Sequence, residues 1–147
     1  MRSVRAFVLL VAVTAVVGFC LPAADAQPPP PVIRLLWVQT SNHPNGKRTS
    51  WTSQLLNANP QFGKPAGAKV GAEVGISHGR DFVGGIHLPG GVLEYSGTVK
   101  HLKRGAFSVP VVDGSGAFAG VTGTYTRSKG DKAHPGSTIV VLQLRYG

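Results

Sequence analysis

Two glutamates are the residues of this sequence whose type and position best suit acid–base chemistry. Glu73 lies in the alternating segment 70–77, on the face opposite to the apolar residues of that segment. That apolar face carries Ala72, Val74 and Ile76. Glu94 lies in the segment 92–101, on the face opposite to Tyr95. A carboxylate that points into a dry interior acts as a general acid or base, because loss of hydration favours its protonated form. We therefore take Glu73 and Glu94 as the catalytic candidates, although an outward position paired with a basic neighbour is the simpler interpretation of Glu94.

Other kinds of catalytic or metal site have little support in the sequence. The five histidines contain no H-x-H or H-x-x-x-H pair, so metal-ligand spacing is missing. His87, on the predicted strand before Pro89, is the best histidine for an interior position. No serine lies in a nucleophile elbow, and no helix pattern follows the glycines at 114–120 to make a phosphate site. We expect no metal and no cofactor.

The first 26 residues have the pattern of a secretory signal peptide. Arg2 and Arg5 precede an apolar run at 6–21, and Ala24-Asp25-Ala26 has small residues at the two positions that a signal peptidase reads. The run has 16 residues, fewer than the roughly 20 with which a helix spans a bilayer. We predict a secreted protein with cleavage after Ala26.

The rest of the chain is expected to form one domain, preceded by a short spacer. Residues 27–31 contain four consecutive prolines, which form a stiff extended segment. Residues 32–147 have the length of a single domain. The only cysteine, Cys20, leaves with the signal peptide, so packing and sheet hydrogen bonds must stabilise the exported protein without disulfides.

The chain is strongly basic, with a formal net charge of +9. A basic exported protein is attracted to anionic surfaces such as cell-wall polymers or lipid headgroups, although solubility is the simpler interpretation. The basic residues include two clusters, Lys100, Lys103 and Arg104 in one and Arg127, Lys129 and Lys132 in the other. We interpret both clusters as solvated loop tips. No nucleic acid is expected as a partner, because the few aromatic residues lie on apolar strand faces and not among the basic ones.

Short alternating runs separated by glycine corners predict an all-β fold without helices. About eight antiparallel strands are expected, at 33–40, 49–56, 70–77, 82–88, 92–101, 107–112, 118–127 and 138–146. A turn is expected at 43–46, and a long loop at 57–69 that overhangs an open end. Glycines inside the predicted strands would weaken a flat sheet but suit a small barrel that bends sharply. We therefore predict a single eight-stranded antiparallel β-barrel, whose interior can hold a small molecule.

Three glycine-containing blocks resemble the allene oxide cyclase and dirigent superfamily. They are Val70-Gly71-x-x-x-Gly75, Gly91-Val92-Leu93-x-x-x-Gly97 and Val111-Val112-x-Gly114-Ser115-Gly116-x-Phe118-x-Gly120-x-x-Gly123. The last block is the most specific of the three, and the resemblance covers about 69–146. It implies an eight-stranded antiparallel barrel that forms a homotrimer. It also implies an apolar substrate in the barrel cavity, where ring closure or radical coupling is steered with little acid–base chemistry.

The resemblance is incomplete at the residues that the cyclases use. The segment 33–40 has no carboxylate where they have a glutamate, Ser77 stands at the position of their cysteine, and Thr122 stands at the position of an aromatic residue. These departures argue against allene oxide cyclisation itself and not against the barrel. Substrate-binding side chains are expected at Trp37, Ser77, His87, Tyr95 and Thr122.

We expect an exported barrel that binds a small hydrophobic molecule and steers its cyclisation or isomerisation. The barrel wall supplies orientation, and Glu73 or Glu94 supplies polar assistance. The alternative is a non-catalytic carrier, or a surface-associated binding protein, that uses the same cavity or the basic exterior. A carboxylate inside the barrel discriminates between the two hypotheses, because acid–base catalysis has no candidate if both glutamates point outward.

Overall fold

The chain folds into antiparallel strands, as the alternating pattern predicts. The computed structural model describes residues 28–102 and 105–147, so the predicted signal peptide lies outside the described residues. The strands are β1 (Val32–Asn45), β2 (Arg48–Asn57), β3 (Lys69–His78), β4 (Asp81–Leu88), β5 (Gly91–Thr98), β6 (Lys100–His101), β7 (Phe107–Gly116), β8 (Thr122–Lys129) and β9 (Thr138–Arg145). The all-β prediction is confirmed. Within the described ranges there is no helix of the length and apolarity needed to cross a membrane.

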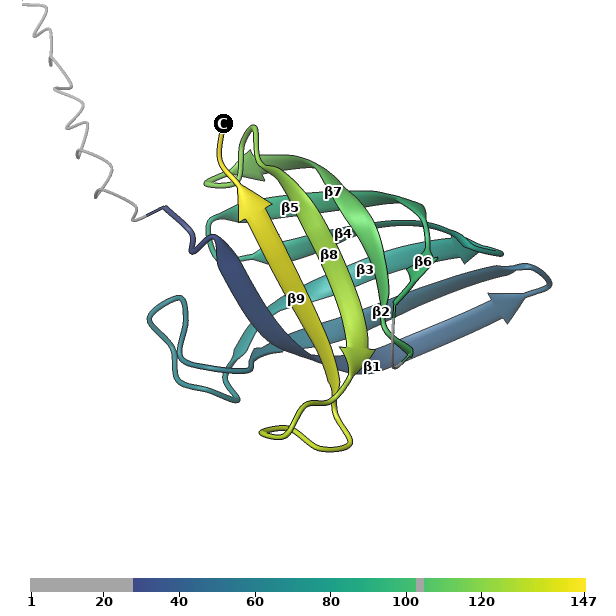
Figure 1. Ribbon diagram of the computed structural model, residues 1–147, viewed down its shortest axis with the longest axis horizontal. Coiled ribbons are helices and arrows are strands. Elements are labelled where there is room, and N and C mark those ends of the chain that lie inside the picture. The colour runs from purple at the N-terminus through teal and green to yellow at the C-terminus, as the bar shows by residue number, and fades with distance from the viewer. Residues whose placement is uncertain (1–27, 103–104) are drawn as a thin grey trace, which may run out of the picture.

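The sheet closes on itself into a barrel (Figure 1). The strand order is β5-β4-β3-β2-β1-β9-β8-β7-β6, and a further antiparallel pairing of β5 with β7 completes the ring. The short β6 pairs with β7, so the barrel wall has eight strands, as predicted. An eight-stranded barrel is just wide enough for its interior to be filled by side chains. Every second residue of each strand points into that interior.

Two predicted turns are instead parts of strands. The turn expected at 43–46 is wrong in its extent, because β1 continues to Asn45 and stays paired with β2. The pairing of β1 with β9 ends at Trp37, and a strand with one free edge accepts a proline such as Pro44. Likewise, β7 continues beyond the predicted end at residue 112 to Gly116, because residues 113–116, expected as a glycine corner between strands, pair with β5 and close the barrel.

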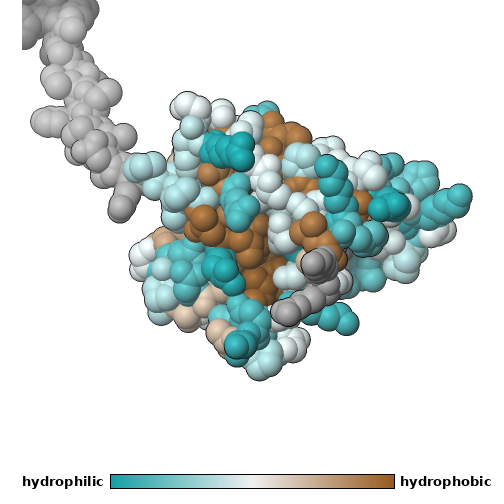
Figure 2. All heavy atoms as spheres, in the orientation of Figure 1, coloured by the Kyte–Doolittle hydropathy of each residue, from teal (hydrophilic) through white to brown (hydrophobic). Residues whose placement is uncertain are grey.

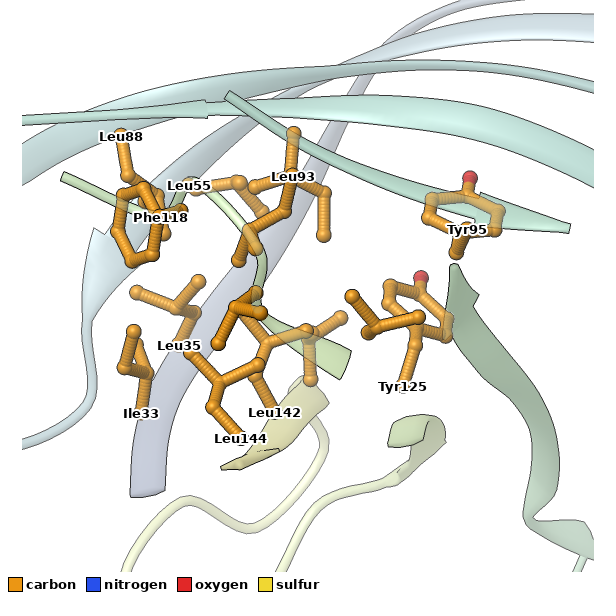
Figure 3. Close-up of a cluster of buried hydrophobic side chains, with 14 of the residues drawn as sticks. Ile33, Leu35, Leu55, Leu88, Leu93, Tyr95, Phe118, Tyr125, Leu142 and Leu144 are labelled. Atoms are coloured by element: carbon orange, nitrogen blue, oxygen red, sulfur yellow. The ribbon is translucent and has the colours of Figure 1, made fainter. Parts of the chain in front are cut away.

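The barrel interior has an aliphatic half and an aromatic half. The aliphatic half consists of buried side chains, namely Ile33, Leu35, Leu55, Leu88, Leu93, Leu142 and Leu144. Figure 3 shows these side chains near the ring of Phe118, while the rings of Tyr95 and Tyr125 lie together, apart from them. Each fully buried aliphatic side chain contributes about 1.5–3 kcal/mol. This half is therefore the packed core of the barrel, and the buried carboxylate of Glu73 lies in the other half.

On the face shown in Figure 2, apolar residues gather in patches over the middle of the barrel, among hydrophilic and neutral residues. The β1–β2 hairpin projects beyond the barrel (Figure 1), and the residues at its tip are exposed and mainly hydrophilic. On β3 the outward side chain of Val74 is 51% exposed. The apolar face of β3 is thus its outer face, and the face that carries Glu73 is turned inward.

Candidate active site

The inward face of β3 carries a fully buried carboxylate. Glu73 is 0% exposed, and its Oε1 accepts hydrogen bonds from aromatic side chains of three other strands. The donors are Trp51 Nε1 on β2 at 3.3 Å, the Tyr95 hydroxyl on β5 at 2.5 Å and the Tyr125 hydroxyl on β8 at 3.2 Å. Hydrogen bonds of this kind compensate a buried charge for its lost hydration. Three ring donors therefore take the place of water around one carboxylate oxygen.

The other carboxylate oxygen is much less engaged. Glu73 Oε2 accepts a bond from the Tyr125 hydroxyl at 3.4 Å, which is longer than an ordinary O–H···O bond. Ser53 lies opposite Glu73 in the β2–β3 register and is 2% exposed, and its Oγ has no hydrogen-bond partner among the described residues. The Oε1 bonds fix the orientation of the carboxylate, and the lone pairs of Oε2 are the less occupied ones. A general base accepts a proton through such a lone pair.

Two glycines make room for the rings that hold the carboxylate. A Cβ on Gly84 would overlap the ring and hydroxyl of Tyr95, and a Cβ on Gly75 would overlap the ring of Trp51. Gly84 pairs with both Gly75 and Tyr95 across β3, β4 and β5. Glycines inside strands commonly mark such close approaches. The sequence therefore places small residues where the wall must admit Trp51 and Tyr95.

The two tyrosines stack on each other, with ring centroids 4.5 Å apart. Burial raises the pKa of the Tyr95 and Tyr125 hydroxyls, and the negative charge of Glu73 raises the pKa of each further. The physical reason is that a phenolate would be both desolvated and next to a carboxylate. Both hydroxyls are therefore protonated at neutral pH and donate to Glu73.

The buried tyrosines predict a loss of stability at alkaline pH. Above about pH 10, which is the pKa of a tyrosine in an unfolded chain, the unfolded chain releases protons that the folded chain retains. The contribution of these two hydroxyls to the free energy of unfolding is therefore constant below that pH. Above it, the contribution falls by about 1.4 kcal/mol per pH unit for each tyrosine. Urea unfolding between about pH 9 and 11 measures this slope, and Tyr95→Phe should remove about half of the contribution of the pair. An unchanged slope in Tyr95→Phe would contradict a buried, protonated hydroxyl.

A guanidinium group from β8 completes the aromatic half. The Cζ of Arg127 lies over three rings, at 4.8 Å from the centroid of Trp37, 5.3 Å from that of Trp51 and 4.7 Å from that of Phe107. Its Nη1 lies 4.0 Å from Glu73 Oε1, and its side chain is 15% exposed. The interpretation of Arg127 as a solvated loop tip is therefore wrong. Its position in β8 turns it inward, where ring faces stabilise its charge.

Some of the predicted site residues come together in the aromatic half. Glu73 and Tyr95 are hydrogen bonded to each other, and Trp37 stacks on Arg127. Ser77 is half-buried on the same face of β3 as Glu73.

The other predicted site residues lie elsewhere. Glu94, His87 and Thr122 are exposed. Glu94 and His87 point outward because their strand neighbours Tyr95 and Ile86 are buried inside the barrel. These three residues do not reach the cluster around Glu73. The exposure of Glu94 agrees with the simpler interpretation of this residue, in which its side chain points outward.

Three residues that contact Glu73 were not predicted as site residues, namely Trp51, Tyr125 and Arg127. A signal for Trp51 was present in the sequence, because it shares a face with Leu55 in a predicted strand. Tyr125 and Arg127 likewise share one face of a predicted strand, but Arg127 was grouped with the lysines that follow it along the chain. Alternation within the strand was a better guide to Arg127 than the charge of its sequence neighbours.

The cluster has the parts needed for proton transfer to and from a small molecule. It has an oriented carboxylate, protonated phenols and a guanidinium group, all in a setting lined by aromatic rings. Among residues 28–102 and 105–147, no three His, Cys, Asp or Glu side chains are placed to hold a metal ion. The chain is thus a closed eight-stranded antiparallel β-barrel with a buried carboxylate site.

Comparisons with known proteins agree with this architecture. The sequence matches no protein-family model and no curated protein. A solved structure described as pyocyanin demethylase is similar to this barrel, with a TM-score of 0.56 and 19% sequence identity over 78% of this chain and 99% of the other. At this identity the similarity shows the fold alone. The barrel implied by the resemblance is confirmed, whereas membership of the allene oxide cyclase and dirigent superfamily stays a prediction.

Proposed function

We propose that this barrel binds a small, largely apolar molecule in its aromatic half and steers the isomerisation or cyclisation of that molecule, with Glu73 as the proton acceptor. The observation that carries the proposal is the complete burial of Glu73 among three ring donors, with Arg127 4.0 Å away. Burial of a charged pair is a poor way to stabilise a fold, because packed apolar residues of similar volume are often as stable or more stable. A buried cluster of titratable groups is instead typical of functional sites.

The proposed chemistry uses one carboxylate in two steps. Glu73 Oε2 removes a proton from a carbon of the bound molecule, the electron pair left behind forms a new double bond to the next carbon, and the electrons of the original double bond move to its far carbon. The resulting carboxylic acid returns the proton at a different carbon, so the product is an isomer and no other reactant is consumed. Hydrogen bonds from Tyr95 and Tyr125 hold the carboxylate in place during both steps. The aromatic walls hold the molecule in one reactive conformer.

The fold comparison supports the part of the proposal that makes the barrel an enzyme. The name of the similar structure, pyocyanin demethylase, gives an enzymatic activity on pyocyanin. By its name, the similar protein is therefore an enzyme with this barrel fold. The reaction, substrate and residues proposed for the present barrel rest on its own cluster around Glu73.

Native mass spectrometry of the protein purified from its producer tests the binding. A retained small molecule is the expected result, and incubation of that molecule with wild-type protein is expected to yield an isomer of equal mass. Glu73→Gln should bind the molecule without converting it, while the exposed Glu94→Gln should do both. Conversion by Glu73→Gln at the wild-type rate would contradict the proposed base. A molecule that the wild-type protein binds and leaves unchanged would favour the carrier hypothesis.

We also propose that the protein is exported. The charged start, short apolar run and small-residue cleavage site of residues 1–26 support this. The intact mass of protein from the culture medium should correspond to a chain that begins at Gln27. A full-length chain that remains with the cells would contradict the proposal.

A further inference from the structure

Two buried hydrogen-bond donors of the aromatic half have no acceptor among the described residues. They are Trp37 Nε1 and Arg127 Nη1, both shielded from solvent by surrounding atoms. The guanidinium carbon lies 4.8 Å from the centroid of the Trp37 ring, so both donors belong to one site. An indole and a guanidinium group donate hydrogen bonds and do not accept them. The group that complements them must therefore be an acceptor.

The aromatic rings around Arg127 stabilise its charge but leave this hydrogen-bonding capacity unused. Trp37, Trp51 and Phe107 present their faces to the guanidinium group, and a ring face attracts a cation without accepting a full N–H···O bond. Glu73 Oε1, at 4.0 Å from Nη1, lies beyond hydrogen-bond distance. An unsatisfied buried donor is costly, and two of them next to a functional carboxylate point to a ligand.

We propose that Arg127 and Trp37 bind an anionic oxygen, a carboxylate or an enolate, on the small molecule that the barrel takes up. This inference rests on the proposed function and narrows its substrate class to amphiphilic molecules, with an apolar body and one anionic oxygen. Arg127 is suited to this role because its planar group forms directed hydrogen bonds to such oxygens while stacking on rings. The guanidinium group then lies between two negative charges, those of Glu73 and the ligand. It thereby anchors one end of the molecule relative to the base.

Two probes of the same shape test the inference. 2-Naphthoate carries a carboxylate, and 2-naphthamide is its neutral counterpart. Isothermal titration calorimetry of the full chain should show the acid binding about 10- to 100-fold more tightly than the amide, the difference expected from a charge-assisted hydrogen bond. In a ¹H–¹⁵N correlation spectrum, the indole N–H signal of Trp37 should shift with the acid and much less with the amide. Trp37→Phe identifies that signal by its disappearance.

Variants separate the two donors from general effects of charge. Trp37→Phe keeps an aromatic ring and removes the donor, so it should lower the acid-to-amide preference severalfold. Glu73→Gln combined with Arg127→Gln removes both buried charges together, which avoids leaving one unpaired, and should bring the preference close to one. Arg145→Gln removes one positive charge from an exposed position and should leave the preference unchanged.

The outcomes distinguish this inference from the proposed function. Equal affinity for the two probes, no binding of either, or a preference that survives the double variant would overturn the anion site. Glu73→Gln alone should still prefer the acid, because both donors remain. If Glu73→Gln keeps this preference but also converts the natural molecule at the wild-type rate, the anion site stands and the proposed base falls.

Discussion

Replacement of Glu73 by alanine is expected to lower the free energy of unfolding by about 3–5 kcal/mol, whereas Glu94→Ala should change it by less than about 0.5 kcal/mol. The two residues have the same side chain and lie in neighbouring parts of the barrel wall, but Glu73 is fully buried and Glu94 is exposed. Removal of Glu73 leaves the charge of Arg127 without its partner and leaves three ring donors without an acceptor. Urea unfolding of the two variants at neutral pH measures the difference.

A double variant shows whether this cost reflects a stabilising role. Glu73→Leu combined with Arg127→Met removes both charges and fills similar volume. Apolar replacement of a whole buried pair is often neutral or stabilising, so the double variant should regain most of the stability that Glu73→Ala loses. Such a result would show that the loss of stability in Glu73→Ala comes from leaving Arg127 without its partner, and not from a net stabilisation by the pair. A cost below about 1 kcal/mol for Glu73→Ala would contradict the burial of a charged Glu73.

Gly84→Ala is expected to destabilise the barrel by about 1–3 kcal/mol, the usual cost of overpacking, while Gly85→Ala should be neutral or slightly stabilising. The two glycines are adjacent in β4 and both have backbone conformations open to alanine. A Cβ on Gly84 would overlap the Tyr95 ring, whereas a Cβ on Gly85 would have its nearest neighbour at 3.9 Å. The Tyr95 ring must therefore move in Gly84→Ala, and its hydrogen bond to Glu73 must weaken.

Two measurements check this second prediction. Urea unfolding of Gly84→Ala and Gly85→Ala compares their stabilities in the same strand. Binding of the natural molecule by each variant tests the link to the site, because a displaced Tyr95 no longer orients Glu73. Equal stability of the two variants would show that the Tyr95 ring does not lie against Gly84.

Much of the wall of the barrel could be predicted from the sequence, because strands leave a local signal. In β5, for example, Leu93 and Tyr95 alternate with Glu94, and the first two are buried while the third is exposed. The glycines inside the predicted strands also indicated a small barrel. In β3, polarity does not indicate which face points into the barrel. The apolar face of β3, with Val74, is the outer face, because the rings of Trp51 and Tyr95 occupy the space at the inner face.

The cluster around Glu73 was less accessible to prediction, because its members are far apart in the chain. Trp51 and Tyr95 are each 22 residues from Glu73, and Tyr125 is 52 residues away. Alternation places each of them on one face of a strand, but it does not say which strands lie across the barrel from each other. Arg127 shows the consequence, since the lysines that follow it in the chain, Lys129 and Lys132, are exposed, whereas its spatial neighbours are aromatic rings.

The order of polar and apolar residues along the chain determined the strands, their number and the two faces of each, because side-chain direction in a strand repeats every two residues. Closure of the ring by β5 and β7 decided the rest. β5 lies two strands from β3 through β4, but only that pairing encloses β8 opposite β3, so that the phenol and the guanidinium group of β8 meet Glu73 away from water. The identity of the site is thus a property of the closed barrel, because mutual burial of these groups requires a wall that has no open edge.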